Sequence, residues 1–222
     1  MIPLRDTNRP RYFPVMNWIL IIANVLVFFF ELGLSSGQLE RFIGTFALLP
    51  SRLQSQPATY AITIFTSMFM HAGWFHILSN MWVLFIFGDN VEDRMGPIPY
   101  LIFYLLGGTA AALLQTYVGA GRNIPVLGAS GAIAAVLGAY IFLFPRARIV
   151  SLVFIVFFIT IVEIPALIFI GFWFVTQLFS GLASIGAVEG VAWWAHIGGF
   201  LVGLVISPLF LRRSPPRQIE FF

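Results

Sequence analysis

The chain has 222 residues, of which 59% are hydrophobic and only 9% are charged, whereas an average soluble domain is about a quarter charged. This small number of charged residues cannot cover the exterior of a water-soluble protein of this size. The composition therefore predicts an integral membrane protein. The absence of cysteine excludes disulfides, thiolate metal sites and a thiol nucleophile. All basic residues are arginine and the net charge is only +3, which bears on membrane orientation and indicates no nucleic-acid partner.

Apolar windows recur along nearly the whole chain, and each membrane-spanning helix requires about 20 apolar residues. The first window follows three arginines; because it is long and lacks a small-residue cleavage site, we interpret it as a retained span and not as a signal peptide. We expect a single membrane domain, residues 1–222, with six spans at about residues 15–34, 74–88, 98–118, 126–144, 161–181 and 191–211. The expected fold class is an all-α, six-helix membrane bundle, in which residues 149–160 form an interfacial or partly inserted lead into the fifth span.

The arginines predict the orientation of this bundle. With six spans, nine arginines fall on the side of both termini, namely Arg5, Arg9, Arg11, Arg94, Arg146, Arg148, Arg212, Arg213 and Arg217. Three fall on the opposite side, namely Arg41, Arg52 and Arg122. Because cytoplasmic loops carry the excess of positive charge, both termini are predicted to be cytoplasmic.

Polar side chains inside membrane spans are costly and are therefore candidates for function. His71, His76 and Asn80 lie at or near the start of the second span, Ser130 near the start of the fourth, and His196 near the start of the sixth. These three spans all run from the outer to the inner side. We therefore expect the polar groups in one plane, on the order of 6 to 10 Å below the outer surface.

The fourth and sixth spans carry small residues beside these polar groups. His196 shares its helical face with Gly199 and Gly203, and Ser130 shares its face with Ala134, because positions three, four or seven apart lie on one side of a helix. Small residues let two membrane helices approach closely, as a hydrogen bond between Ser130 and His196 requires. A serine hydroxyl becomes a nucleophile when a neighbouring base takes its proton, and neutral imidazole is suited to that role.

A carboxylate that would orient His196 is not apparent. Glu163 is expected near the inner surface, and Glu189 in an outer loop before the sixth span. We therefore predict a Ser–His dyad in which packing, and not a carboxylate, orients the imidazole.

Acyl transfer also needs hydrogen-bond donors aimed at the developing oxyanion. His76 and Asn80 are four residues apart and share one face of the second span. We expect the Asn80 amide, a ring nitrogen of His76 and backbone N–H groups at the start of the fourth span to be these donors.

The same residues also have structural interpretations. A serine in a membrane helix often donates back to a carbonyl one turn earlier, and a histidine at the end of a span is often an interfacial group. The shared depth and the small-residue faces favour a functional over a structural role for Ser130 and His196. For His71, a structural and a functional role are equally favoured. A zinc site is disfavoured, because His71 and His76 are five residues apart and no cysteine is present. The aromatic residues expected to face lipid or the interface are Trp173, Phe174, Trp193 and Trp194.

Three motifs resemble those of the rhomboid intramembrane serine proteases. They are Gly-Ala-Ser-Gly at Gly128–Gly131, Ala-His-x-x-Gly-x-x-x-Gly at Ala195–Gly203, and His-x4-His-x3-Asn at His71–Asn80. Each motif alone is weak, but together and in this order they are highly specific, and the resemblance covers about residues 46–205. It implies a six-helix membrane fold in which the loop at about residues 35–60 lies partly in the membrane.

By this resemblance, Ser130 would be the nucleophile and His196 the general base, with His76 and Asn80 at the oxyanion hole. Structural or auxiliary positions would be His71, Gly128, Gly131, Glu92, Gly199 and Gly203. Ala134 occupies a position where many relatives have an aromatic residue that stacks on the catalytic imidazole.

The expected function is cleavage of other membrane proteins, in or next to a transmembrane segment, through an acyl-enzyme. The expected partners are transmembrane substrates and the lipid bilayer, without a cofactor, a metal or a nucleic acid. The alternatives are a non-catalytic rhomboid-like protein that binds membrane clients and a small transporter, which the shallow polar groups disfavour. Because no transit peptide or additional domain is apparent, we expect a multi-pass protein of a prokaryotic plasma membrane, with a eukaryotic organelle as the less favoured alternative.

Overall fold

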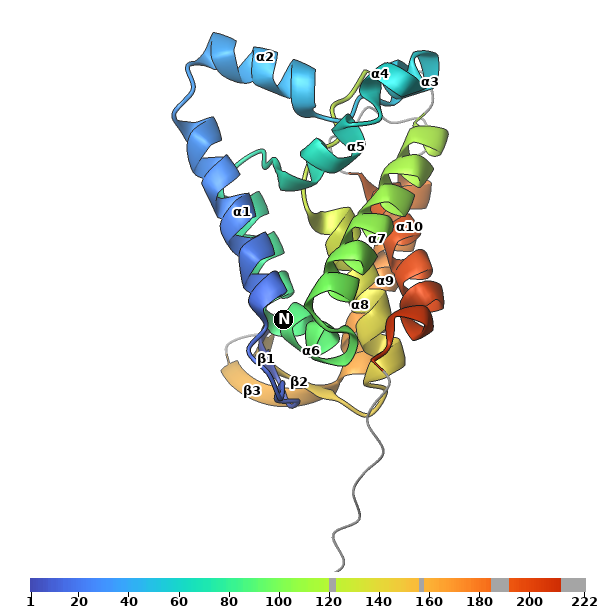
Figure 1. Ribbon diagram of the computed structural model, residues 1–222. Helices are drawn as coiled ribbons and strands as arrows, with labels where there is room; N and C mark the ends of the chain where they lie inside the picture. Colours follow the sequence, from blue (N-terminus) through green and yellow to red (C-terminus); the bar gives the residue numbers. More distant parts are fainter. Residues whose placement is uncertain (120–122, 156–157, 185–191, 213–222) are drawn as a thin grey trace, which may run out of the picture.

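A computed structural model describes residues 1–119, 123–155, 158–184 and 192–212, most of which are helical. The longer helices pack side by side as a bundle (Figure 1). They are α1 (Val15–Leu32), α6 (Trp74–Met95), α7 (Pro97–Val118), α8 (Ser130–Leu143), α9 (Ala166–Ala183) and α10 (Trp193–Ile206). Short helices connect α1 to α6, namely α2 (Ser36–Phe46), α3 (Pro50–Ser55), α4 (Pro57–Tyr60), α5 (Thr63–Thr66) and the 3-10 helix η1 (Ser67–Phe69). A second 3-10 helix, η2 (Ser207–Phe210), continues α10.

Each of the six expected spans overlaps one of the longer helices, although α6 continues to Met95 and α9 begins only at Ala166. Within the described residues, four helices are long and apolar enough to cross a membrane: α1, α7, α9 and the stretch Trp193–Phe210. A fifth span results if the segments Pro57–Phe69 and Trp74–Met95, which meet at a bend of 82°, are counted together. The remaining helix, α8, is apolar but shorter. The chain is therefore a multi-pass helical membrane protein, and the count of six spans stays a prediction.

The protein is not all-α, because three strands form an antiparallel sheet in the order β1-β2-β3. They are β1 (Ile2–Asp6), β2 (Arg148–Ile155) and β3 (Phe158–Pro165). The described part of the expected lead into the fifth span, residues 149–155 and 158–160, thus lies in β2 and β3, and α9 begins only at Ala166. The physical reason is that β-branched and aromatic side chains dominate this stretch, and they favour strands as much as they favour lipid. Pairing with β1 then gives β2 hydrogen-bond partners on the edge that does not face β3.

The core of the bundle is α8, which is buried along nearly its whole length and contacts α6, α7, α9 and α10. Most of its residues are alanine, glycine or aliphatic. Such small side chains let neighbouring helices approach the backbone of α8 closely, which is how membrane helices gain packing energy. This central helix also carries Ser130 at its first position.

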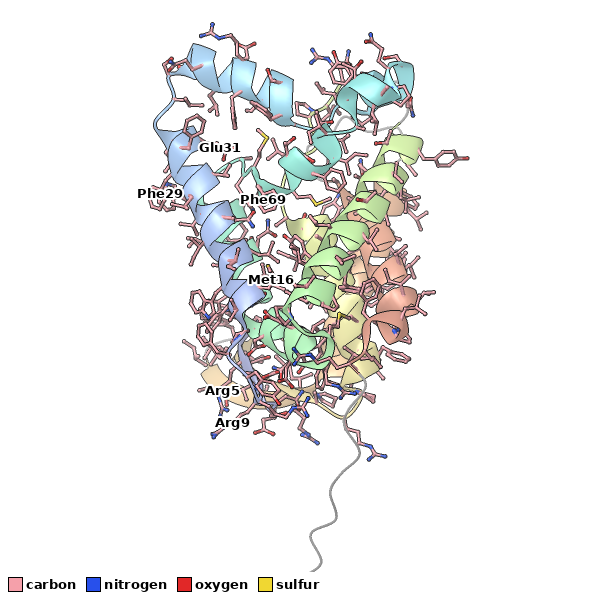
Figure 2. All side chains as sticks on the ribbon, in the orientation of Figure 1. Arg5, Arg9, Met16, Phe29, Glu31 and Phe69 are labelled. Atoms are coloured by element: carbon pink, nitrogen blue, oxygen red, sulfur yellow. The ribbon has the colours of Figure 1, made fainter. Side chains whose placement is uncertain are left out.

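The two ends of the bundle differ in the number of arginines that they carry. Arg5 and Arg9 lie at the end that carries the sheet, whereas Glu31 lies near the opposite end (Figure 2). Other arginines join the sheet end: Arg11 pairs with Asp93 at 3.0 Å, and Arg148 begins β2. Those at the other end are Arg41 and Arg52, on α2 and α3. Arg122, Arg213, Arg217 and Glu189 lie outside the described residues.

A buried polar cluster joins the sheet to the bundle. The carboxylate of Asp6, in β1, accepts hydrogen bonds from the Tyr140 hydroxyl and from the Asn90 amide, the latter at 2.9 Å. Tyr140 also accepts a hydrogen bond from Asn8 at 2.9 Å. Because burial disfavours the ionised carboxylate, the pKa of Asp6 is raised to about 6.

Candidate active site

Ser130 is the first residue of α8, and the turn before it depends on Gly128. Gly128 has a φ of +122°, a region that favours glycine. A Cβ at this position would lie 2.7 Å from the imidazole of His76, so a larger residue would also collide with that ring. The Gly128 N–H donates to the carbonyl oxygen of Ser67 at 2.8 Å. The turn thus presents Ser130, half-buried, at a helix start whose first N–H groups have no intrahelical partner.

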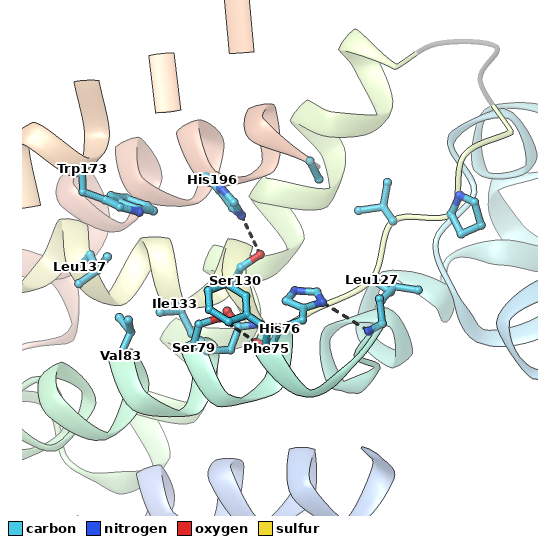
Figure 3. A pocket seen from close by; sticks show the side chains of 15 residues that line it. Phe75, His76, Ser79, Val83, Leu127, Ser130, Ile133, Leu137, Trp173 and His196 are labelled. Carbon is cyan, nitrogen blue, oxygen red and sulfur yellow. Dashed lines mark hydrogen bonds between the residues drawn. The ribbon is translucent and has the colours of Figure 1, made fainter. Parts of the chain in front are cut away.

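His196 approaches Ser130 from α10, and the imidazole Nε2 lies 2.8 Å from the Ser130 Oγ (Figure 3). Glycine explains how the two helices come this close. A Cβ on Gly199 would overlap the carbonyl oxygen of Gly131, and a Cβ on Gly203 would overlap the backbone of α8 in the same way. The small-residue face of α10 therefore lies directly against the backbone of α8.

A third residue, Gln177, contacts His196, and no motif in the sequence marks it. Its Oε1 lies 2.7 Å from the Nδ1 of His196, and the side chain is only 5% exposed. The one signal in the sequence is that Gln177 is the only long polar side chain in α9. Its partner depends on how α9 packs against α10, which hydropathy does not reveal. Of the two glutamates considered as partners, Glu163 is exposed in β3 and Glu189 is not described.

Two of the four aromatic residues expected to face lipid or the interface, Trp173 and Trp193, lie beside this histidine. Trp173, on α9, has its ring centroid 6.0 Å from that of His196, and the Trp193 ring meets the imidazole edge-on at 6.1 Å. Phe174 stacks on a phenylalanine of α10 at 4.2 Å. All four aromatic residues, Trp194 included, are half-buried, and their contact with lipid or the interface stays a prediction. The aromatic neighbours of His196 come from α9 and α10, whereas Ala134 is fully buried in α8.

His76 and Asn80 lie in the first two turns of α6 and line the same cavity as Ser130. The backbone N–H of Ala72 donates to the Nδ1 of His76 at 3.4 Å. The ring proton of a neutral His76 therefore belongs on Nε2, which faces the Gly128 turn. This orientation leaves an Nε2–H donor beside the turn that precedes Ser130.

His71 supports Asn80 and is not itself part of the cavity lining. The Asn80 Nδ2 donates to the His71 Nε2 at 3.0 Å, which holds the amide group of Asn80 in one orientation. The backbone N–H of His71 donates in turn to the carboxylate of Glu31 on α1 at 3.1 Å. Glu31 is a supporting residue that the sequence analysis does not identify.

Glu92 lies far from this cluster and caps α1. Its carboxylate accepts hydrogen bonds from the backbone N–H groups of Met16 and Asn17, at 3.0 Å and 2.7 Å. Sixteen residues of α6 separate Glu92 from His76, which corresponds to about 24 Å of helix. Glu92 therefore stabilises the contact between α1 and α6.

Ser130, His196, His76 and Asn80 open onto one cavity of about 560 Å³. In Figure 3, α6 forms one wall with Phe75, Ser79 and Val83, while Trp173 and His196 lie across the cavity. Among its described lining residues, the polar side chains are His76, Ser79, Asn80, Ser130 and His196. The cavity is thus apolar except around the Ser–His pair, and it has room for an extended peptide segment.

The fold and the site define a class of protein, a multi-pass membrane protein with a serine–histidine pair in a cavity between its helices. A model of the Rhomboid domain family matches residues 58–213. The chain therefore belongs to the rhomboid family.

Individual relatives agree with this assignment. RHOMBOID-like protein 1 of Arabidopsis thaliana is 26% identical over 229 residues, which cover 91% of this chain and 54% of the relative. The mitochondrial Rhomboid protein 1 of Saccharomyces cerevisiae is 28% identical and covers 74% of this chain and 45% of the relative. The human mitochondrial presenilin-associated rhomboid-like protein is 30% identical, and the match covers 68% of this chain and 38% of the relative. The chain spans about half the length, or less, of these curated relatives.

Proposed function

We propose that this chain is an intramembrane serine endopeptidase that cleaves other membrane proteins in or next to a transmembrane segment. The observation that carries this proposal is the 2.8 Å distance between the Ser130 Oγ and the His196 Nε2, inside a cavity that also holds His76 and Asn80. Membership of the rhomboid family supports it.

In the proposed reaction, His196 Nε2 takes the hydroxyl proton as Ser130 Oγ attacks the scissile carbonyl carbon. The oxyanion would accept hydrogen bonds from the His76 Nε2–H, the Asn80 amide and the first N–H groups of α8. His196 then gives its proton to the leaving amine as the C–N bond breaks, which leaves an acyl-enzyme on Ser130. A water molecule, deprotonated by His196, would hydrolyse this ester and restore the serine.

The substrate would enter sideways between α6 and α9, the helices that contribute opposite walls of the cavity. The scissile carbonyl has to be freed from helical hydrogen bonds, so segments with Gly, Pro or other helix-weakening residues should be preferred. Water would reach the half-buried Ser130 from the nearer membrane surface.

Six spans with both termini on the arginine-rich side complete the proposal. The arginines at the sheet end support this orientation by the positive-inside rule. The names of two relatives above place those proteins in mitochondria, so they lend no support to a prokaryotic plasma membrane. The proposal accordingly names an integral membrane location and no particular organelle.

A fluorophosphonate probe tests the proposal, because it reacts with an activated serine. The detergent-solubilised wild type, Ser130→Ala and His196→Ala would be treated with the probe and with a reporter protein that carries one transmembrane segment. We expect wild type to be labelled and to cleave the reporter, and both variants to lose both properties. Equal labelling of all three proteins would refute the dyad, and reporter binding without labelling or cleavage would favour the non-catalytic alternative.

A further inference from the structure

Gln177 is buried, polar and in direct contact with the imidazole of His196, and the reaction above gives it no role. We propose that Gln177 is the positioning residue of the dyad, which holds His196 in the one neutral tautomer that can accept the serine proton. This inference rests on the proposed function, and it identifies what orients the imidazole in the absence of a carboxylate.

The orientation of the Gln177 amide follows from its other two contacts. Its Nε2 donates to the carbonyl oxygen of Trp173 at 3.3 Å and to the hydroxyl oxygen of Thr176 at 3.1 Å. The Thr176 hydroxyl uses its own proton to donate to the same Trp173 carbonyl at 2.6 Å. A carbonyl oxygen can only accept, so the NH2 group of Gln177 has to face it. The amide oxygen is therefore the atom that faces His196.

An amide oxygen can only accept, and this decides where the proton of His196 lies. The Nδ1 must carry the proton and donate it to Gln177 Oε1, because a bare Nδ1 would place two lone pairs 2.7 Å apart. The Nε2 of a neutral ring is then unprotonated and accepts the hydroxyl proton of Ser130 at 2.8 Å. All hydrogen bonds from Ser130 through His196 to Gln177 thus run in one direction, toward the Trp173 carbonyl. The opposite tautomer would leave the serine without a base.

The proton balance is simple. When Ser130 attacks, its proton moves to the His196 Nε2, and the imidazolium keeps its Nδ1–H on Gln177 Oε1. The neutral amide takes no proton, and the proton on the His196 Nε2 remains available for the leaving amine. A buried carboxylate in place of Gln177 would add a net charge inside the bilayer, which is costly. The amide provides the same orientation without this cost.

The aromatic contacts of His196 also support its positioning by α9. Trp173 is four residues before Gln177, so both side chains lie on one face of α9, and both contact His196. Ala134 leaves the stacking position on α8 without an aromatic ring. The face of α9 therefore provides both the hydrogen-bond acceptor and an aromatic neighbour for the imidazole.

The test compares wild type with Gln177→Met, which keeps the length but loses the acceptor, and with Gln177→Glu, which keeps the acceptor and adds charge. Phe179→Leu, on the exposed face of α9, is the matched control. Reporter cleavage would be measured as kcat and KM across pH 5 to 9. We expect Gln177→Met to lose roughly 10- to 100-fold in kcat with little change in KM, the effect of one lost orienting hydrogen bond.

Gln177→Glu should stay active at high pH, with the acid limb of its pH profile moved up by about 1 to 3 units, because a carboxylate favours the charged imidazolium. His76 is the only other titratable side chain among the described residues that line the cavity. A His76→Gln background therefore separates the limb due to His196 from any contribution of His76.

Nitrogen NMR of 15N-histidine-labelled protein reads the tautomer directly and does not depend on activity. The chain has three histidines, and His196→Ala assigns the relevant signals. We expect a protonated Nδ1 and a bare Nε2 in wild type, and a mixture of tautomers in Gln177→Met. A folded Gln177→Met with the wild-type rate and tautomer would overturn the inference, as would an unshifted acid limb in Gln177→Glu. Failure of the proposed function looks different, because wild type would then be neither labelled by fluorophosphonate nor active.

Discussion

The contact between α7 and α8 beside the serine predicts the effect of Gly131→Ala. A Cβ on Gly131 would lie 2.6 Å from the Cβ of Ala111 on α7, whereas carbon atoms in contact prefer about 3.5 to 4.0 Å. Neither methyl group can rotate away, so α8 has to move by about 1 Å. Overpacking of this kind costs about 1 to 3 kcal/mol of the free energy of unfolding.

The displacement also acts on the adjacent Ser130. Its Oγ lies 2.8 Å from the His196 Nε2, and a shift of about 1 Å along this direction exceeds the range of a good hydrogen bond. A misplacement of that size costs on the order of 100-fold in rate. We therefore expect Gly131→Ala to be less stable and to react with fluorophosphonate on the order of 100-fold more slowly than wild type.

Two further variants make this prediction specific. Gly171→Ala is the matched control, because a Cβ at Gly171 meets nothing within 4 Å, and it should be neutral or more stable by up to about 1 kcal/mol. The double variant Gly131→Ala with Ala111→Gly moves the methyl group across the interface and should recover most of the stability and labelling rate. Unfolding would be followed by circular dichroism in detergent micelles. Wild-type stability and labelling in Gly131→Ala, or no recovery in the double variant, would refute the reasoning.

Three more predictions concern other parts of the molecule. Asp6→Asn should be more stable than wild type at pH 8, because burial raises the pKa of Asp6 to about 6 and ionising this carboxyl in the folded protein therefore costs stability. Denaturation across pH 4 to 8 should show wild type losing at most about 3 kcal/mol more than the variant between about pH 4 and 6, with no further difference building up above pH 6. Glu92→Gln weakens two hydrogen bonds to the start of α1 and should lower the free energy of unfolding by about 1 to 3 kcal/mol. The folded fraction should react with fluorophosphonate at the wild-type rate. A slower reaction would contradict a purely structural role of Glu92. Gly128→Ala introduces a strained φ and a collision with His76, so labelling should fall by at least roughly 10-fold, and a fully labelled Gly128→Ala would show that the turn does not position Ser130.

The membrane class and the positions of the helices are local properties, and the sequence alone predicts them well. The apolar window at 98–118 corresponds to the helix Pro97–Val118, and the first window corresponds to Val15–Leu32. These predictions succeed because a bilayer imposes one length and one composition on every span. The motifs around Ser130 and His196 point to the family for a similar reason, since their spacing is visible along the chain.

The sheet shows where hydropathy stops being informative. β1 and β2 are more than 130 residues apart in sequence, with Asp6 opposite Ile149, and an apolar β-branched run suits a strand as well as a membrane lead. Pairing with β1 decides between the two, and that pairing is a contact between distant segments.

In the candidate active site, too, the sequence predicts some features and only the tertiary structure determines the others. The sequence determines which rare polar groups lie near the starts of α6, α8 and α10. Only the tertiary structure brings Ser130 within 2.8 Å of His196, turns Trp173 toward the imidazole and sets Gln177 against its far nitrogen. The physical reason is that a hydrogen bond depends on distances of a few tenths of an ångström, which arise from how α8, α9 and α10 pack and not from the composition of any one of them.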